Sequence, residues 1–298
     1  MPLRYWALIA TLGILWGSSF LFNQILLREI GPLTVSLGRV GLGALGCWAW
    51  ILASGRDARL PAGTVLGLFL LGLVFFALPF ALYPLSQRHI GSGVAGIVNA
   101  MTPVMVVVVS HLWPGGERAN WRKALGVMAG LAGIVTLALP VLRQGVNAEF
   151  WAILTALCAP LCYGIATNLA RRFRAIDPTI IAAWSLTGAA LAMAPVALGL
   201  EGWPVITRAE TWVSLAMIGF VLTSAAFIAF YWLLARAGAT MTSTVTFIAP
   251  VSAVLLGVGV LGEALLPAHL AGMALIFLGL VVIDGRLLRR AGLTGPAE

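Results

Sequence analysis

Charged residues are scarce in this sequence. Of its 298 residues only 9% are Asp, Glu, Lys or Arg, whereas 61% are hydrophobic, and the mean hydropathy is +1.02. A soluble domain carries roughly a quarter of charged residues. The composition therefore excludes a soluble globular protein and predicts an integral membrane protein.

Lysine and histidine are nearly absent as well. Lys123 is the single lysine, and the sequence has no glycine-rich loop that ends in Lys-Ser or Lys-Thr, which excludes a nucleotide-binding P-loop. The histidines His89, His111 and His269 are scattered, so we expect no metal site and no cofactor. The net charge of +8 comes from short basic clusters between apolar runs. Such clusters are typical of membrane topology signals rather than of nucleic-acid binding.

Ten apolar runs take up most of the chain, and each is near the length of about 20 residues that a membrane-spanning helix needs. They cover residues 5–27, 33–53, 64–86, 92–112, 121–142, 150–170, 178–199, 211–234, 240–261 and 268–285. Only about 98 residues remain for loops and tails, too few for a catalytic domain outside the membrane. The first run is longer than a signal-peptide core and lacks a cleavage site, so we expect it to be retained. The predicted fold class is all-α and integral to the membrane.

One motif occurs twice, about half a chain apart. The first copy contains Tyr83, Arg88, Pro103 and Glu117, and the second contains Tyr231, Arg236, Pro250 and Glu263. Tyr and Arg are five residues apart in both copies, and the later spacings differ by one residue. This repetition predicts two related units of five helices each, residues 1–145 and 146–298, within one membrane domain.

The basic residues predict the orientation of the chain. With a cytoplasmic N-terminus, thirteen Lys and Arg residues fall on the cytoplasmic side, including Arg286, Arg289 and Arg290, and four fall on the other side. Positive charge is retained in the cytoplasm, so both termini are predicted to be cytoplasmic. Because five spans is an odd number, the second unit must insert upside down relative to the first. Inverted repeats are typical of secondary transporters, with the substrate site between the halves.

Prolines within the spans predict bends. Proline removes a backbone donor and kinks a helix. Pro103 and Pro250 hold equivalent places in the two motif copies, and Pro79 and Pro84 lie close together in the third span. We expect these four prolines to act as hinges or gates around a central cavity; a bend that serves only packing is the alternative. Glycines of the fifth and tenth spans predict close helix contact, within one chain or in a homodimer.

Several motifs together resemble a known family. They are Trp16-Gly17-Ser18-Ser19-Phe20, Pro32-Leu33 followed by Arg39, Thr102-Pro103, and Gly262-Glu263. Their order resembles the drug/metabolite transporter superfamily, more narrowly its ten-span bacterial exporter family (EamA-like), and the chain is similar to the branch that exports aromatic amino acids. The resemblance implies ten helices, inverted five-helix repeats, a central substrate cavity and export from the cytoplasm. Ser185 stands where the first half has Arg39, so no symmetric pair of arginines is implied.

Polar and aromatic residues inside the spans are the candidates for substrate binding. We select Trp16, Tyr83, Asn99, Tyr163, Trp184 and Tyr231. An amphipathic substrate needs a few hydrogen-bonding groups among apolar walls, and aromatic faces can hold an ammonium group. The alternatives are interface anchoring or packing for the aromatic residues and an interhelical hydrogen bond for Asn99. Arg39, a charge inside the membrane, is a functional hypothesis with a structural role as its equal alternative.

These observations predict a multi-pass transporter in the bacterial inner membrane that exports small metabolites, most of all amino acids, by alternating access. No carboxylate lies near the centre of a span, where proton-coupled carriers commonly place one, so facilitated, uncoupled transport is expected. The expected partners are a small-molecule substrate and membrane lipid. The alternatives are an exporter of hydrophobic cations or drugs and a lipid-handling membrane protein. An enzyme would need an acid–base or nucleophile constellation, and none has suitable spacing.

Overall fold

The computed structural model describes residues 3–285, apart from the side chains at positions 239 and 240. In this part of the chain every regular element is helical. In chain order the elements are α1 (Leu3–Leu26), α2 (Pro32–Ala53), α3 (Ala62–Gly72), η1 (Leu73–Ala77), α4 (Leu78–Ser86), α5 (Ser92–Asn99), α6 (Thr102–Leu112), α7 (Trp121–Arg143), α8 (Ala148–Ala170), η2 (Arg171–Phe173), α9 (Pro178–Glu201), α10 (Ala209–Ala216), η3 (Met217–Ala225), α11 (Ala226–Thr242), α12 (Val245–Leu261) and α13 (Pro267–Asp284).

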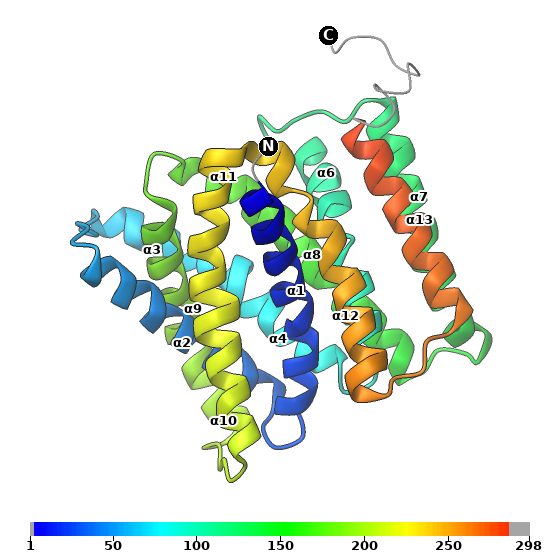
Figure 1. Cartoon of the computed structure of the whole chain (residues 1–298), viewed down its shortest axis with the longest axis horizontal. Coiled ribbons are helices and arrows are strands. Elements are labelled where there is room, and N and C mark those ends of the chain that lie inside the picture. The colour runs from blue at the N-terminus through cyan, green and yellow to red at the C-terminus, as the bar shows by residue number, and fades with distance from the viewer. Residues whose placement is uncertain (1–2, 286–298) are drawn as a thin grey trace.

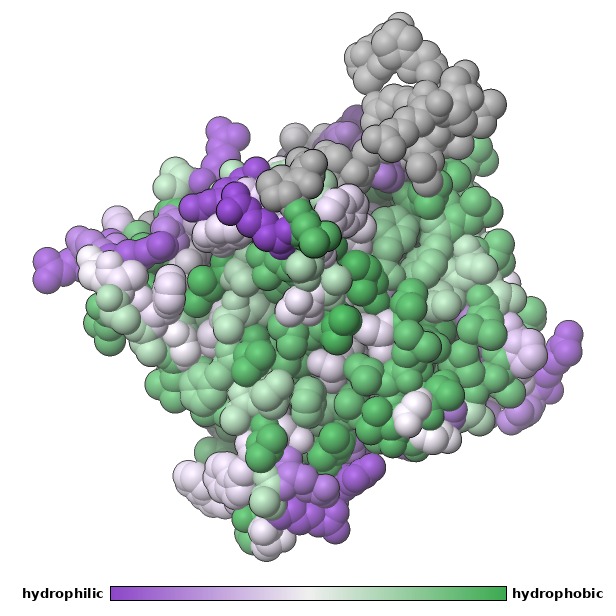
Figure 2. All heavy atoms as spheres, viewed as in Figure 1, coloured by the Kyte–Doolittle hydropathy of each residue, from purple (hydrophilic) through white to green (hydrophobic). Residues whose placement is uncertain are grey.

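These elements join into the apolar helices that the sequence predicts. Nine helices of the described residues are long and apolar enough to cross a membrane, and α12 adds a tenth apolar helix of 17 residues. A helix satisfies all of its backbone hydrogen bonds internally, which is why an apolar chain crosses lipid in this form. Figure 2 shows apolar side chains over the middle of the visible face and hydrophilic ones gathered toward its ends. The fold is that of a multi-pass membrane protein.

The helices form a bundle in which the first turn of α1 and the last turn of α13 lie at the same end (Figure 1). We call this the terminal end; it also holds residues 54–61 and 174–177. The opposite, distal end holds residues 27–31, 87–91, 202–208 and 262–266. Arg286, Arg289 and Arg290, which contribute to the predicted charge asymmetry, lie outside the described residues.

Glycines allow the closest helix pairs to form. Helices α7 and α13 lie side by side at one edge of the bundle (Figure 1), and a Cβ atom at Gly133 would stand 2.7 Å from the carbonyl oxygen of Gly272. A Cβ atom at Gly279 would stand 2.5 Å from the oxygen of Gly126. Since only glycine fits where two backbones approach this closely, the predicted role of these residues in helix contact is confirmed within one chain.

Two spans contain π-helical segments that the sequence analysis did not predict. The third span has η1 between α3 and α4, and it ends two residues before Pro79. The eighth span has η3 between α10 and α11 and contains no proline. Thr223 and Ser224 in η3 donate hydrogen bonds to carbonyl oxygens five residues earlier, at 2.7 and 3.1 Å. π-Helical turns occur frequently at functional sites.

The four predicted hinge prolines differ in their surroundings. Pro103 follows a helix break at residues 100–101, whereas Pro250 lies inside the continuous helix α12, with the break at residues 243–244. Pro84 is buried inside α4. The helix breaks near Pro103 and Pro250 are therefore not at equivalent positions.

Candidate functional site

Aromatic side chains from four spans meet in the interior of the bundle. We call this the central aromatic cluster; it consists of Trp16, Phe75, Phe76, Phe80, Tyr163, Phe227 and Tyr231. Trp16 comes from α1 and Tyr163 from α8, while the others come from the third and eighth spans. Both halves of the chain thus contribute to one site.

Ring contacts connect the cluster continuously. The ring centroid of Phe227 lies 5.6 Å from that of Trp16, 5.4 Å from that of Phe76 and 6.1 Å from that of Tyr231. Phe75 lies 5.6 Å from Tyr163. These separations are in the range of favourable edge-to-face and offset aromatic pairs. Trp16, Tyr163 and Tyr231 of the cluster are only partly buried.

Arg39 of α2 lies at one side of this cluster. Its guanidinium carbon is 3.8 Å from the ring centroid of Phe80, a cation–π contact. Its Nε atom donates to the Thr223 hydroxyl at 3.1 Å, and Nη2 donates to the Ser19 hydroxyl at 3.2 Å. A buried positive charge therefore lies beside the aromatic rings, held by side chains from three other spans.

Tyr83 and Asn99 form a polar pair next to the cluster. The Tyr83 hydroxyl donates to Oδ1 of Asn99 at 2.7 Å, across α4 and α5. Tyr83 also packs edge-on against Phe20 at 5.1 Å and belongs to the buried core against which Tyr163 packs. The bond to Tyr83 orients the Asn99 side chain.

Trp184 lies apart from the other predicted residues. Its indole nitrogen donates to the carbonyl oxygen of Ala58 at 3.0 Å, and its ring packs against Trp48 at 5.0 Å. The structure thus brings together five of the six residues predicted to bind substrate and places the sixth near the terminal end, between α9 and the loop after α2.

Sequence reasoning missed the phenylalanines of the cluster and the hydroxyl partners of Arg39. Phe75, Phe76 and Phe80 lie within nine residues of Tyr83, and Phe227 lies four residues before Tyr231. The density of aromatic residues just before each motif tyrosine is the signal that would have found them. The roles of Ser19 and Thr223 had no such signal, because they depend on how α1, α2 and η3 pack.

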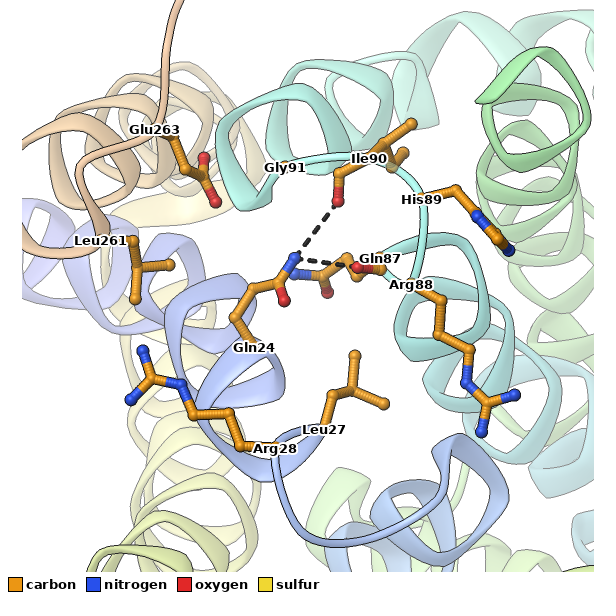
Figure 3. Close-up of a pocket in the computed structure, with 10 residues that line it drawn as sticks. All are labelled: Gln24, Leu27, Arg28, Gln87, Arg88, His89, Ile90, Gly91, Leu261 and Glu263. Atoms are coloured by element: carbon orange, nitrogen blue, oxygen red, sulfur yellow. Dashed lines mark hydrogen bonds between the residues drawn. The ribbon is translucent and has the colours of Figure 1, made fainter. Parts of the chain in front are cut away.

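Side-chain amides of α1 form hydrogen bonds to the loop after α4 at the distal end. Gln24 Nε2 donates to the carbonyl oxygens of Gln87 and Ile90 at 3.0 and 3.2 Å (Figure 3), and Asn23 donates to Gln87 Oε1 at 3.0 Å. Gln24, Gln87 and Ile90 line a cavity of ≈590 Å³, which Arg28, Arg88 and Glu263 also line. A second hollow, ≈520 Å³, lies between α2 and α9 and has an almost entirely apolar lining.

Three carboxylates at the distal end accept hydrogen bonds at or just before the starts of helices in the other half of the chain. Glu201 accepts from the backbone N–H groups of Leu33 and Thr34 at 3.0 and 2.8 Å. Glu263 accepts from the N–H groups of Ser92 and Gly93 at 2.6 and 2.9 Å. A negative group at a helix N-terminus satisfies free donors and is favoured by the helix dipole. The carboxylates therefore join the two halves at this end.

Glu29 is the third of these carboxylates. It accepts from the backbone N–H and the hydroxyl of Thr207, both at 2.6 Å, and from the Thr211 hydroxyl. Hydrogen bonds to the ionised form favour it. The bonds from Thr207 and Thr211 lower the pKa of Glu29 from 4.5 to about 2.

The chain is similar to known proteins along most of its length. A solved crystal structure, 24% identical, superimposes with a TM-score of 0.66 over 95% of this chain and 98% of that one, which shows a shared fold. A probable terminal-alkyne amino-acid exporter of Streptantibioticus cattleyicolor is 25% identical over 289 residues, 96% of this chain and 94% of the relative. The inner membrane transporter YedA of Escherichia coli is 24% identical over 279 residues, 91% of this chain and 88% of the relative.

The family model of the EamA-like transporters matches twice, at residues 4–139 and at residues 150–284. The two matches leave unmatched only the short segment between them and the chain ends. Together with the apolar helical bundle and the names of the relatives, this confirms the resemblance to the EamA-like family. The chain belongs to the EamA-like transporter family and is a multi-pass membrane transporter.

Proposed function

We propose that this transporter exports small amphipathic metabolites, amino acids foremost and aromatic ones among them, across the bacterial inner membrane. The observation that carries the proposal is the central aromatic cluster with Arg39 beside it, built from both halves of the chain. Partly exposed aromatic rings, a polar pair at Tyr83 and Asn99 and one buried charge fit a ligand with an apolar side chain and a charged head. The name of the relative from Streptantibioticus cattleyicolor, an amino-acid exporter, supports the same substrate class.

The transport mechanism in this proposal is alternating access between inverted repeats, residues 1–145 and 146–298. Packing supports it: α1 lies against α12 and α8 against α6, which are the pairs that exchange when the two halves are interchanged. The π segments fall in the third and eighth spans, again corresponding positions. In inverted-repeat transporters the halves rock around a fixed midplane site. We place the terminal end in the cytoplasm, because the basic residues are concentrated there.

Counterflow uptake in proteoliposomes tests the substrate class. Vesicles loaded with unlabelled compound are given radiolabelled amino acids, sugars or organic cations, and we expect exchange of amino acids, aromatic ones included. Tyr83→Ala and Asn99→Ala should lower this exchange without lowering expression. Trp151→Ala, at an aromatic residue of α8 that is 61% exposed, is the matched control and should exchange normally. Trp184→Ala tests the predicted residue that lies outside the cluster.

Two outcomes contradict the proposal. Exchange of organic cations without amino acids would make the protein a cation exporter, and phospholipid scrambling without solute exchange would make it a lipid-handling protein. A pH gradient imposed across the same vesicles tests coupling. Uncoupled transport requires that amino-acid flux persist without the gradient, since no carboxylate lies near the centre of a span to carry a proton.

A further inference from the structure

Arg39 is a charged residue with unusually little compensation. It lies in the interior of α2, a membrane-spanning helix, and only 7% of its surface is exposed. An uncompensated charge in a membrane interior is costly, and such residues face the protein interior and mark substrate or ion pathways. The question is which negative group balances it.

The residues that the structure describes place no negative group against Arg39. Arg39 bonds to two neutral hydroxyls, those of Thr223 and Ser19, and the Thr223 hydroxyl gives its own proton to the carbonyl oxygen of Ile218 at 2.7 Å. Among the residues that the structure describes, the three ion pairs all lie near the membrane surfaces and none includes Arg39. Its third nitrogen, Nη1, has no hydrogen-bond acceptor in that part of the chain and is not fully enclosed.

The surroundings of the guanidinium define how an anion would approach it. Phe80 covers one face of the planar group at 3.8 Å, and Nη1 is the nitrogen without a hydrogen-bond partner among the described residues, so an anion would approach from the Nη1 side. Phe80 in turn packs against Phe76 of the central aromatic cluster, with ring centroids 5.8 Å apart. An arginine edge matches a carboxylate with two parallel hydrogen bonds, and the adjoining rings suit an apolar or aromatic substituent.

We propose that Arg39 binds the carboxylate of the transported substrate and that the central aromatic cluster holds its side chain. This inference rests on the proposed function and narrows it: the carboxylate is the required group, whereas the amine is not. The substrates are small monocarboxylates with an apolar or aromatic side chain, zwitterionic amino acids included, and amines without a carboxylate are excluded.

Three compounds that differ by one group test the proposal. Phenylalanine has both groups, 3-phenylpropionate lacks the amine, and phenethylamine lacks the carboxylate. The first measurement is the thermal stability of the purified protein in detergent with each compound, because it reports binding without requiring transport. We expect a rise in unfolding temperature with phenylalanine and 3-phenylpropionate and none with phenethylamine.

Substitutions assign the effect to Arg39. In Arg39→Gln, phenylalanine and 3-phenylpropionate should no longer raise the unfolding temperature. Counterflow exchange of these two acids should fall by roughly tenfold or more, as expected when charge-assisted hydrogen bonds to the ligand are lost. Arg39→Lys keeps the charge but not the forked geometry, so it should retain weakened binding of the same compounds. Arg143→Gln, at an exposed arginine of α7, is the control and should behave as wild type.

The outcomes separate this inference from the proposed function. Phenethylamine binding as strongly as phenylalanine in the wild type would overturn it, and so would unchanged acid binding in Arg39→Gln. If Arg39→Gln does not fold, the binding of the three compounds to the wild type and to Arg39→Lys tests the proposal. Phenethylamine binding as strongly as phenylalanine would then overturn it. Selective binding of the acids without any amino-acid exchange would support the site and count against export.

Discussion

Glu117 and Glu263 hold equivalent places in the two motif copies, yet they make different contacts. Glu263, at the distal end, accepts hydrogen bonds from Ser92 and Gly93 at the start of α5 and so joins the two halves of the chain. Glu117, at the terminal end, pairs with Lys123 in its own half, and its side chain is 67% exposed. Glu263 thus connects the two halves of the chain, whereas Glu117 forms its ion pair within one half.

The same difference extends to the two ends of the bundle as a whole. At the distal end three carboxylates accept hydrogen bonds from the other half of the chain, and two of them, Glu201 and Glu263, cap helix N-termini. The terminal end has the exposed ion pair of Arg56 and Asp177 and the Trp184 bond to Ala58. Exposed ion pairs contribute little stability, while charge-assisted bonds to helix N-terminal N–H groups contribute more. The distal end is therefore the more firmly held of the two. Under the proposed inverted repeats, the opposite conformation would release Glu263 and engage Glu117.

Glu263→Gln should have the largest effect on this comparison. The change leaves the N–H groups of Ser92 and Gly93 with a weaker, neutral acceptor, and we expect a loss of about 2 kcal/mol, the usual size for hydrogen bonds to a charged group. Thermal unfolding in detergent measures the loss, and labelling of a cysteine introduced in residues 87–91 should become faster. Unchanged stability and labelling would mean that Glu263 does not hold the distal end.

Glu29→Gln should have a smaller effect with a defined pH dependence. Because the pKa of Glu29 is lowered from 4.5 to about 2 in the folded protein, the stability from its ionised form is fully present above pH 4.5 and is lost as the pH falls toward 2. The unfolding temperatures of wild type and variant should therefore differ by the same amount at about pH 5 and pH 8. A difference that changes over this range would show that Glu29 titrates there and that its bonds are weaker than the structure indicates.

Glu117→Gln should have the smallest effect. Its carboxylate is exposed and forms one surface ion pair, so we expect a change in stability of under about 1 kcal/mol. Lys123→Gln, which breaks the same pair from the other side, should match it in thermal unfolding. A loss as large as that of Glu263→Gln would contradict the asymmetry between the two ends.

The spans were predictable because lipid imposes a simple length rule on apolar helices. The predicted runs 33–53 and 121–142 correspond to Pro32–Ala53 and Trp121–Arg143, with ends that agree within one residue. The π segments were not predictable from proline, since Met217–Ala225 contains none. They depend on contacts such as the hydrogen bond from the Trp16 indole to the carbonyl oxygen of Leu222, at 3.2 Å.

The candidate site was predictable only in part. The aromatic residues repeated in the motif, Tyr83 and Tyr231, identify the right spans, and both lie in or beside the cluster. The position of Trp184 and the hydroxyl partners of Arg39 follow from the packing of helices distant in sequence, which one sequence does not reveal. Ser185, the counterpart of Arg39, is buried with an oxygen that lacks a partner among the described residues, so the site is asymmetric.

The π segment η3 has a consequence for how Arg39 is held. Thr223 reaches the guanidinium from within this segment, where each turn contains more residues than in an α-helix. Successive residues of an α-helix are rotated by about 100°, so converting η3 to α-helical geometry would shift its register and turn the Thr223 hydroxyl away from Arg39. A local change of winding in the eighth span would thus strengthen or weaken the hold of Thr223 on Arg39, and with it the orientation of the guanidinium toward an anion.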